Sequence, residues 1–95
     1  MLTLTENAVK AIKSMTADAR TPDEGGLRIA TRSLMDTSLE MELADSPGRK
    51  DQVVEAEGTR VFLEPMAARI LEDRTLDADV TQAGDVSFRI IRQRA

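Results

Sequence analysis

Residues 26–45 read GLRIATRSLMDTSLEMELAD, and this stretch indicates most directly how the chain folds. Apolar side chains occupy every second position in each half: Leu27 and Ile29, then Leu39, Met41 and Leu43. Successive side chains of a strand point to opposite faces, so each half is predicted to be a strand with one buried face. The segment 33–37 is predicted to be the bend that joins the two strands.

Leu34 and Met35 lie in this bend, and two interpretations are open for them. Methionine adapts well to binding surfaces, which makes the pair a candidate contact for a protein partner. Isolated apolar residues in bends are ordinary, however, and we favour the interpretation in which both side chains close the core.

The segment 2–25 predicts a short strand followed by an amphipathic helix. Thr5 is a suitable N-cap, because its hydroxyl can accept a hydrogen bond from a free backbone N–H, so the helix is expected to begin at Glu6. One apolar stripe recurs at three- and four-residue steps: Ala8, Val9, Ala11, Ile12, Met15 and Ala19. Pro22 and the pair Gly25-Gly26 are expected to end the helix and reverse the chain.

Turn signals organise the rest of the chain. The segment 45–50, DSPGRK, predicts a tight turn, and Glu57-Gly58 predicts a short-loop hairpin between QVVEAE and TRVFLE. Pro65 suits the first turn of a short helix that covers apolar surface, mainly with Met66 and Ile70 and secondarily with Ala67 and Leu71. The segments TLDADV and DVSFRII then predict two strands around a turn at residues 82–85.

The expected order is strand, helix, three or four strands, short helix and two strands. Because strands and helices do not alternate regularly, we expect an α+β fold with a mostly antiparallel or mixed sheet and its helices on one side or end. The length of 95 residues is that of one small domain with one modest core, so residues 1–95 are predicted to form a single domain.

Charge and hydropathy exclude several classes of partner. The net charge of -4, with both signs interspersed, provides no clustered positive surface, so nucleic-acid binding is not expected. No apolar run approaches the length of a membrane span, and residues 1–13 do not resemble a secretory signal. A cytoplasmic protein is therefore expected.

The absent residue types narrow the chemistry further. The chain has no cysteine and no histidine, which removes thiolate nucleophiles, imidazole bases and soft metal ligands. It also has no tryptophan or tyrosine, and Phe62 and Phe88 are its only aromatic residues. We expect no enzyme activity and assign no catalytic, cofactor-binding or metal-binding residue.

Two pairs of carboxylates are the remaining candidates for an enzyme or a hard-metal site. Asp77 and Asp79 are two apart on a predicted strand, as are Glu40 and Glu42, so each pair shares a face. Like charges on a wet sheet face are common, and we favour that interpretation over a cation site. Six arginines are candidates for surface ion pairs with the acidic residues: Arg28, Arg32, Arg60, Arg69, Arg89 and Arg92.

Four segments, taken in order, resemble the HesB-like family, also called the A-type iron–sulfur carriers. They are LTLTENAVKAIKSM at 2–15, GGLRIAT at 25–31, DQVVEAEGTRVFLEP at 51–65 and TLDADV at 75–80. The resemblance implies a small β-rich fold, often dimeric, associated with the assembly and delivery of iron–sulfur clusters.

The same resemblance implies three cysteine ligands that this chain lacks. One family cysteine falls near Leu34 or Met35, and the other two belong to a Cys-Gly-Cys tail, whereas this chain ends IIRQRA. Carboxylates and methionine thioethers do not replace thiolates around such a cluster. No cluster-binding residue is therefore carried over.

The leading hypothesis is a non-catalytic binding or assembly module of this fold that holds no cofactor and works with a protein partner or as a homodimer. The main alternative is an accessory subunit in iron–sulfur biogenesis that pairs with a cysteine-bearing relative. A small carboxylate-based enzyme or hard-metal protein that uses the two carboxylate pairs is the less favoured alternative.

Overall fold

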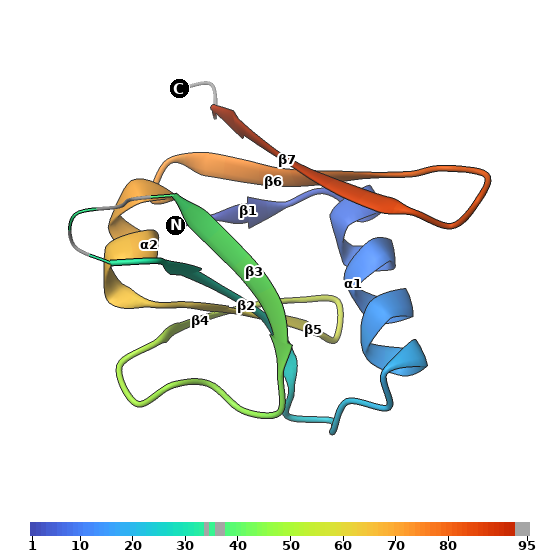
Figure 1. Cartoon of the computed structure of the whole chain (residues 1–95), viewed down its shortest axis with the longest axis horizontal. Helices are drawn as coiled ribbons and strands as arrows, with labels where there is room; N and C mark the ends of the chain where they lie inside the picture. Colours follow the sequence, from blue (N-terminus) through green and yellow to red (C-terminus); the bar gives the residue numbers. More distant parts are fainter. Residues whose placement is uncertain (34, 36–37, 93–95) are drawn as a thin grey trace.

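The computed structural model describes residues 1–33, 35 and 38–92, and it contains the predicted elements in the predicted order (Figure 1). They are β1 (Thr3–Leu4), α1 (Glu6–Asp18), β2 (Gly26–Thr31), β3 (Leu39–Ala44), β4 (Gln52–Ala56), β5 (Thr59–Leu63), α2 (Pro65–Ile70), β6 (Arg74–Val80) and β7 (Val86–Arg92). The α+β prediction is confirmed.

The strands form two sheets rather than the one sheet that was expected. A four-stranded sheet has the order β3-β2-β5-β4, and a three-stranded sheet has the order β1-β6-β7. Each sheet contains one parallel pair, β2 with β5 and β1 with β6, and its other neighbours are antiparallel. The parallel pairs join segments far apart in the sequence, and no local turn signal reveals such pairings.

Helix α1 is built as its sequence pattern predicts. The Thr5 hydroxyl accepts a hydrogen bond of 3.1 Å from the backbone N–H of Ala8 and so caps the helix. Ala8, Val9, Ala11 and Ile12 are buried. Ala19 is exposed, contrary to its place in the predicted stripe, because it is the C-cap residue beyond the last turn.

Helix α2 packs with a different face from the one expected. Ala67 and Leu71 are fully buried, Met66 is half-buried and Ile70 is 37% exposed. In a helix of six residues the apolar positions do not define one stripe, so the orientation follows from the surface it packs on. The prediction that Ile70 is one of the main residues by which this helix covers apolar surface is therefore wrong.

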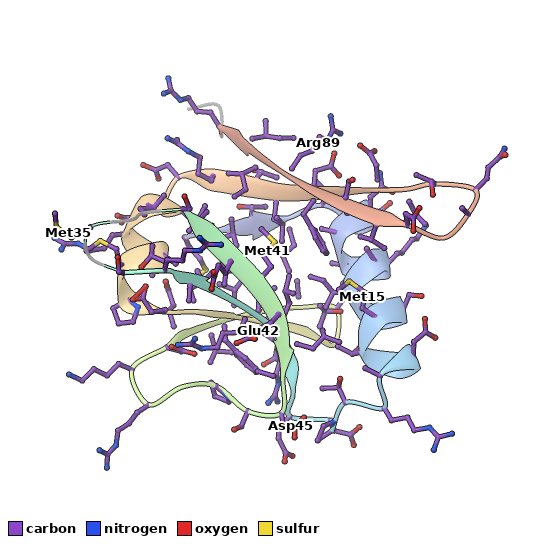
Figure 2. The ribbon with its side chains drawn as sticks, viewed as in Figure 1. Met15, Met35, Met41, Glu42, Asp45 and Arg89 are labelled. Carbon is purple, nitrogen blue, oxygen red and sulfur yellow. The ribbon has the colours of Figure 1, made fainter. Side chains whose placement is uncertain are left out.

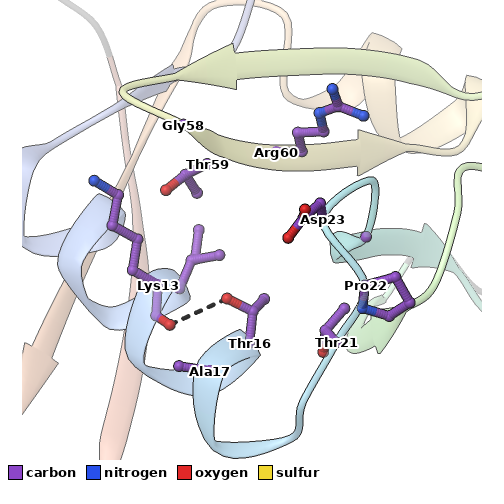
Figure 3. A pocket seen from close by; sticks show the side chains of 11 residues that line it. Lys13, Thr16, Ala17, Thr21, Pro22, Asp23, Gly58, Thr59 and Arg60 are labelled. Atoms are coloured by element: carbon purple, nitrogen blue, oxygen red, sulfur yellow. Dashed lines mark hydrogen bonds between the residues drawn. The ribbon is translucent and has the colours of Figure 1, made fainter.

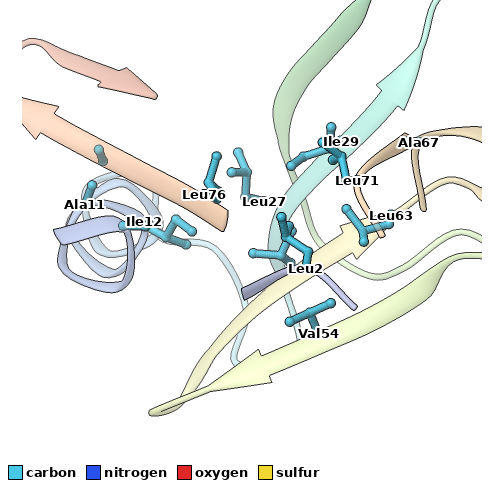
Figure 4. Packing of buried hydrophobic residues seen from close by; sticks show 13 residues of the cluster. Leu2, Ala11, Ile12, Leu27, Ile29, Val54, Leu63, Ala67, Leu71 and Leu76 are labelled. Carbon is cyan, nitrogen blue, oxygen red and sulfur yellow. The ribbon is translucent and has the colours of Figure 1, made fainter. Parts of the chain in front are cut away.

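One apolar core lies between the two sheets and the helices. Figure 4 shows side chains from α1, β2, β4, β5, α2 and β6 converging there, together with Leu2, which precedes β1, and Leu71, which follows α2. This joint burial holds the two sheets together, since removal of apolar surface from water is the main driving force of folding.

Phe62 is buried on the other face of the four-stranded sheet. Its β5 neighbours Val61 and Leu63 belong to the core, and alternation places Phe62 opposite to them, in register with Arg28 and Val53. Phe62 is nevertheless fully buried. The face of this sheet that was predicted to be exposed to solvent therefore contains one buried apolar residue, Phe62.

Two glycines act on the backbone as predicted. The β4–β5 hairpin has a two-residue loop in which Glu57 and Gly58 have φ of 50° and 80°, as a type I′ turn requires. At Gly26 a Cβ atom would lie 2.1 Å from the carbonyl oxygen of Arg60, so only glycine fits between β2 and β5.

Neither α1 nor α2, the helices in the described part of the chain, has the length and apolar character needed to cross a membrane.

Candidate functional site

The segment that joins β2 to β3 is held at its base by the two strands. The backbone N–H of Arg32 donates to the carbonyl of Ser38 at 3.3 Å, and the Arg32 guanidinium donates to Glu40 at 2.7 Å. The backbone N–H of Met35 donates to the Ser33 hydroxyl at 3.2 Å. The strands β2 and β3 are thus connected by a short loop, and the structure describes Met35 at the centre of this loop.

Met35 is 95% exposed, so the expectation that it closes the core is wrong. The strands on either side already bring Leu27, Ile29 and Leu39 to the core, and Met35 extends beyond them, as Figure 2 shows. Leu34, the other residue of the predicted pair, lies outside the described residues. A partner contact by the pair therefore remains a hypothesis, with Met35 accessible for it.

The two carboxylates of β6, Asp77 and Asp79, interact with side chains of other elements and do not simply face solvent. Asp77 accepts hydrogen bonds of 2.6 Å from the Thr5 hydroxyl and 2.6 Å from the Arg89 guanidinium on β7. Arg89 also lies 3.3 Å from the exposed carboxylate of Asp79. The solvated-face interpretation is therefore wrong for Asp77, which is buried, because cross-strand pairing with Arg89 brings it a cation.

The pKa of Asp77 is lowered from its ordinary value, chiefly by the hydrogen bond from Thr5 and then by the backbone N–H of Ala78 and the Arg89 guanidinium. These donors favour the ionised carboxylate. A general acid or base at neutral pH needs a pKa shifted toward 7, and Asp77 is shifted the other way.

The second pair lies in the other sheet. Glu40 and Glu42 are exposed on β3, and Glu40 is paired with Arg32. Within residues 1–33, 35 and 38–92, no group of three or more acidic side chains is placed to hold a metal ion. The two carboxylate pairs thus lie in different sheets, β6 in the three-stranded one and β3 in the four-stranded one.

A further carboxylate, which sequence reasoning did not single out, is the most enclosed of the carboxylates that form ion pairs in the described part of the chain. Asp51 receives a forked pair of hydrogen bonds from Arg28, at 2.8 and 3.0 Å, and a further bond of 2.7 Å from the backbone N–H of Gly48. The Arg28 hydrogen bonds lower the pKa of Asp51, and the Asp51 carboxylate raises that of Arg28. The only sequence signal was an aspartate three residues after the Pro-Gly turn.

The Arg28–Asp51 pair fastens the turn 45–51 to the face of β2. The Asp51 side chain is 2% exposed and the Arg28 side chain 28% exposed. Arg28 is also in register with buried Phe62 on β5. A forked arginine–carboxylate contact fixes geometry in two directions, so this pair has a structural role in the turn.

Comparison with solved structures identifies the fold. The chain matches a crystal structure of IscA with a [2Fe-2S] cluster at a TM-score of 0.74 and 23% identity, over 97% of this chain and 85% of IscA. It matches Escherichia coli SufA, which is involved in the biosynthesis of iron–sulfur clusters, at a TM-score of 0.76 and 20% identity, over 96% of this chain and 84% of SufA.

A solution structure of a protein from Aquifex aeolicus matches at a TM-score of 0.64 and 21% identity, over 93% of this chain and 89% of that protein. Neither a protein-family model nor a curated protein sequence matches the chain. The chain has the fold of the A-type iron–sulfur carriers. IscA and SufA share that fold with it over nearly its whole length, which confirms the resemblance inferred from the four ordered segments.

Proposed function

We propose that residues 1–95 form a single-domain, non-catalytic binding module of the A-type carrier fold that takes part in iron–sulfur cluster assembly without holding a cluster itself. The observation that carries the proposal is a carrier fold matched over 97% of the chain in a sequence with no cysteine and no histidine. The expected location is the cytoplasm.

The donor set of this chain does not fit an iron–sulfur cluster. Such clusters are held by thiolates, with imidazole as the known substitute, and this chain has neither. The side chain that stands at the described centre of the β2–β3 loop is Met35, whose thioether is a weak ligand. A cluster handled by this protein therefore needs ligands from another chain.

The β2–β3 loop is the proposed contact with that partner. Met35 is almost fully exposed at the tip of two paired strands, so its apolar surface would be covered by association with another protein. The partner we propose is a cysteine-bearing protein of the same fold, which would supply the ligands while this chain acts as an accessory subunit.

A second copy of this chain is the competing partner. Strand β7 lies at the edge of the three-stranded sheet and carries Ile90 and Ile91, 37% and 42% exposed. An edge strand offers unpaired N–H and C=O groups to another strand. Light scattering at high micromolar concentration distinguishes the two, because a homodimer predicts twice the 10.4 kDa mass of the chain without any added partner.

Anaerobic reconstitution with iron and sulfide tests the absence of a cluster. The chain is expected to retain no stoichiometric cluster after desalting, whereas IscA, which holds a [2Fe-2S] cluster, treated in parallel is the positive control. A visible absorption band that persists with this chain alone, together with bound iron and sulfide in fixed ratio, would overturn the proposal.

Purification of the tagged chain from its native cell tests the partner. We expect recovery of a cysteine-bearing protein of the same fold, reduced by Met35→Asp at the loop. Val80→Asp is the matched control, since Val80 is also an exposed apolar residue, 58% accessible, but lies at the far end of β6. Recovery of no cysteine-bearing relative, or equal recovery with both variants, would contradict the accessory role.

A further inference from the structure

A cavity of about 230 Å³ lies between the second half of α1, the connection 20–25 and the β4–β5 hairpin (Figure 3). It is partly open to solvent, and no step of the proposed function uses it. Ile12 contributes an apolar wall, while Lys13, Thr16, Asp23 and Thr59 contribute polar groups. Drug-sized ligands occupy about 300–1,000 Å³, so this cavity has room only for a small molecule.

Thr59 places an unsatisfied hydroxyl in this cavity. The residue is 3% exposed, and within the described part of the chain its Oγ1 is the one buried side-chain nitrogen or oxygen without a hydrogen-bond partner. In Figure 3 this oxygen points into the space between β5 and α1. Buried polar groups in proteins are nearly always paired, so an unpaired one that lines a cavity indicates a missing partner.

Three charged side chains line the cavity: Lys13, Asp23 and Arg60. Arg60 is paired with Glu55 at 3.7 Å, which leaves one cation, Lys13, and one anion, Asp23, for a ligand. Figure 3 shows the Lys13 amine and the Asp23 carboxylate on opposite sides of the Thr59 hydroxyl. Neither side chain forms an ion pair within residues 1–33, 35 and 38–92. The Thr16 hydroxyl donates to the Lys13 carbonyl at 3.1 Å, which leaves its oxygen able to accept a further hydrogen bond.

We propose that this cavity binds a small zwitterion of the free α-amino acid class. The ligand carboxylate would pair with Lys13, its ammonium group with Asp23, and a polar atom between them with the Thr59 hydroxyl. Arg60 already has Glu55 as its partner, so a simple anion would leave Asp23 unpaired and a simple cation would leave Lys13 unpaired, whereas a zwitterion matches both. The inference is independent of the role in cluster assembly.

Titration of the isotope-labelled protein, followed by NMR amide shifts, tests the proposal with glycine, L-serine and L-glutamate as probes. Saturable shifts are expected at Lys13, Asp23 and Thr59, with a dissociation constant in the range of about 1 mM that suits a few polar contacts. N-acetyl-L-serine lacks the ammonium group and L-serine methyl ester lacks the carboxylate. Each is expected to bind at least about tenfold more weakly than L-serine.

Three variants locate the site. Lys13→Met and Asp23→Asn are expected to weaken binding about tenfold, while their controls Lys50→Met and Asp73→Asn, at exposed positions away from the cavity, leave it unchanged. Thr59→Val is expected to weaken binding about three- to tenfold and to raise the melting temperature of the ligand-free protein, because it removes an unpaired buried hydroxyl while keeping the shape of the side chain.

The rise in melting temperature keeps Thr59→Val informative even though the residue is buried, since a variant that failed to fold would show the opposite change. The absence of saturable shifts with all three amino acids at about 50 mM, well above the expected dissociation constant, would overturn the proposal. Equal binding of the blocked analogues, or unchanged binding by Lys13→Met and Asp23→Asn, would overturn it as well.

Discussion

Thr5 and Asp77, which are 72 residues apart in the sequence, are joined by a hydrogen bond of 2.6 Å from the threonine Oγ1 to the aspartate Oδ1. The same threonine oxygen accepts from the backbone N–H of Ala8, and the other oxygen of Asp77 accepts from Arg89. One hydroxyl thus connects the start of α1 with β6 and, through the carboxylate, with β7.

This double role of Thr5 predicts coupling between the two residues. Thr5→Ala should lower the free energy of unfolding by about 1 kcal/mol from loss of the helix cap alone. Combined with Asp77→Ala, its effect should be smaller than the sum of the two single effects, because both variants break the same bond. Urea unfolding of the two single variants and the double variant measures this coupling, and Ser14→Ala on the exposed side of α1 is the control. Strict additivity would show that the bond contributes nothing.

The lowered pKa values of Asp51 and Asp77 predict sensitivity to acid. Each carboxylate is ionised more readily in the folded protein than in the unfolded one, so its stabilisation is complete above the ordinary pKa of 3.8. It is lost as the pH falls through the lower folded-state pKa values. Urea unfolding between pH 7 and pH 2 should show stability falling below about pH 4.

Asp51→Asn should isolate one part of that acid response. At pH 7 it removes the charge from the forked contact with Arg28 and should cost about 1–3 kcal/mol, with the difference from the unmodified protein shrinking in acid. Asp45→Asn, in the same turn but exposed, should leave stability within about 0.5 kcal/mol. A loss that stayed constant down to acid pH would contradict the assignment of the acid response to Asp51.

Gly26 is expected to tolerate no side chain. Gly26→Ala places a Cβ against the carbonyl of Arg60 and should separate β2 from β5, at a cost of about 3 kcal/mol or more. Gly58→Ala meets no neighbouring atom and should cost only about 1 kcal/mol, from its positive φ. Thermal unfolding of both variants distinguishes steric contact from backbone strain; equal losses would argue against the close approach of the two strands.

Glu57 provides a stabilising prediction. Its φ of 50° is unfavourable for glutamate and well suited to asparagine, which is the preferred residue before glycine in this turn. Glu57→Asn should raise the free energy of unfolding by about 0.5–1 kcal/mol, measured by urea unfolding. Glu55→Asn in the adjoining strand should not raise it, since β4 requires extended backbone there.

Patterns among residues close in sequence were sufficient to predict the helices and strands. The threonine cap, the helical stripe, the Glu57-Gly58 hairpin and the alternation in β2 depend on residues close in sequence, and each was predicted. Division into two sheets depends on the pairing of Thr3 with Thr75 and of Leu27 with Val61. These are long-range contacts that leave no periodic pattern in the sequence.

The same distinction applies to the candidate sites. Charge alone marked Asp77 and Asp79, but the buried environment of Asp77 follows from Thr5 and Arg89, which belong to other elements. Asp51 and Thr59 were not singled out, since only the packed turn and the cavity next to α1 give them their surroundings. Met35 was expected in the core because composition does not reveal how far a loop extends.

The parallel pairing of β1 with β6 sets a limit on the order of events during synthesis. Strand β1 leaves the ribosome first among the elements, yet its hydrogen-bonding partner is made more than 70 residues later. The β4–β5 hairpin, by contrast, can close as soon as its loop has emerged, since its partners are neighbours. Strand β1 therefore has no hydrogen-bonding partner until β6 has been synthesised, and its backbone and apolar surface stay exposed during that interval.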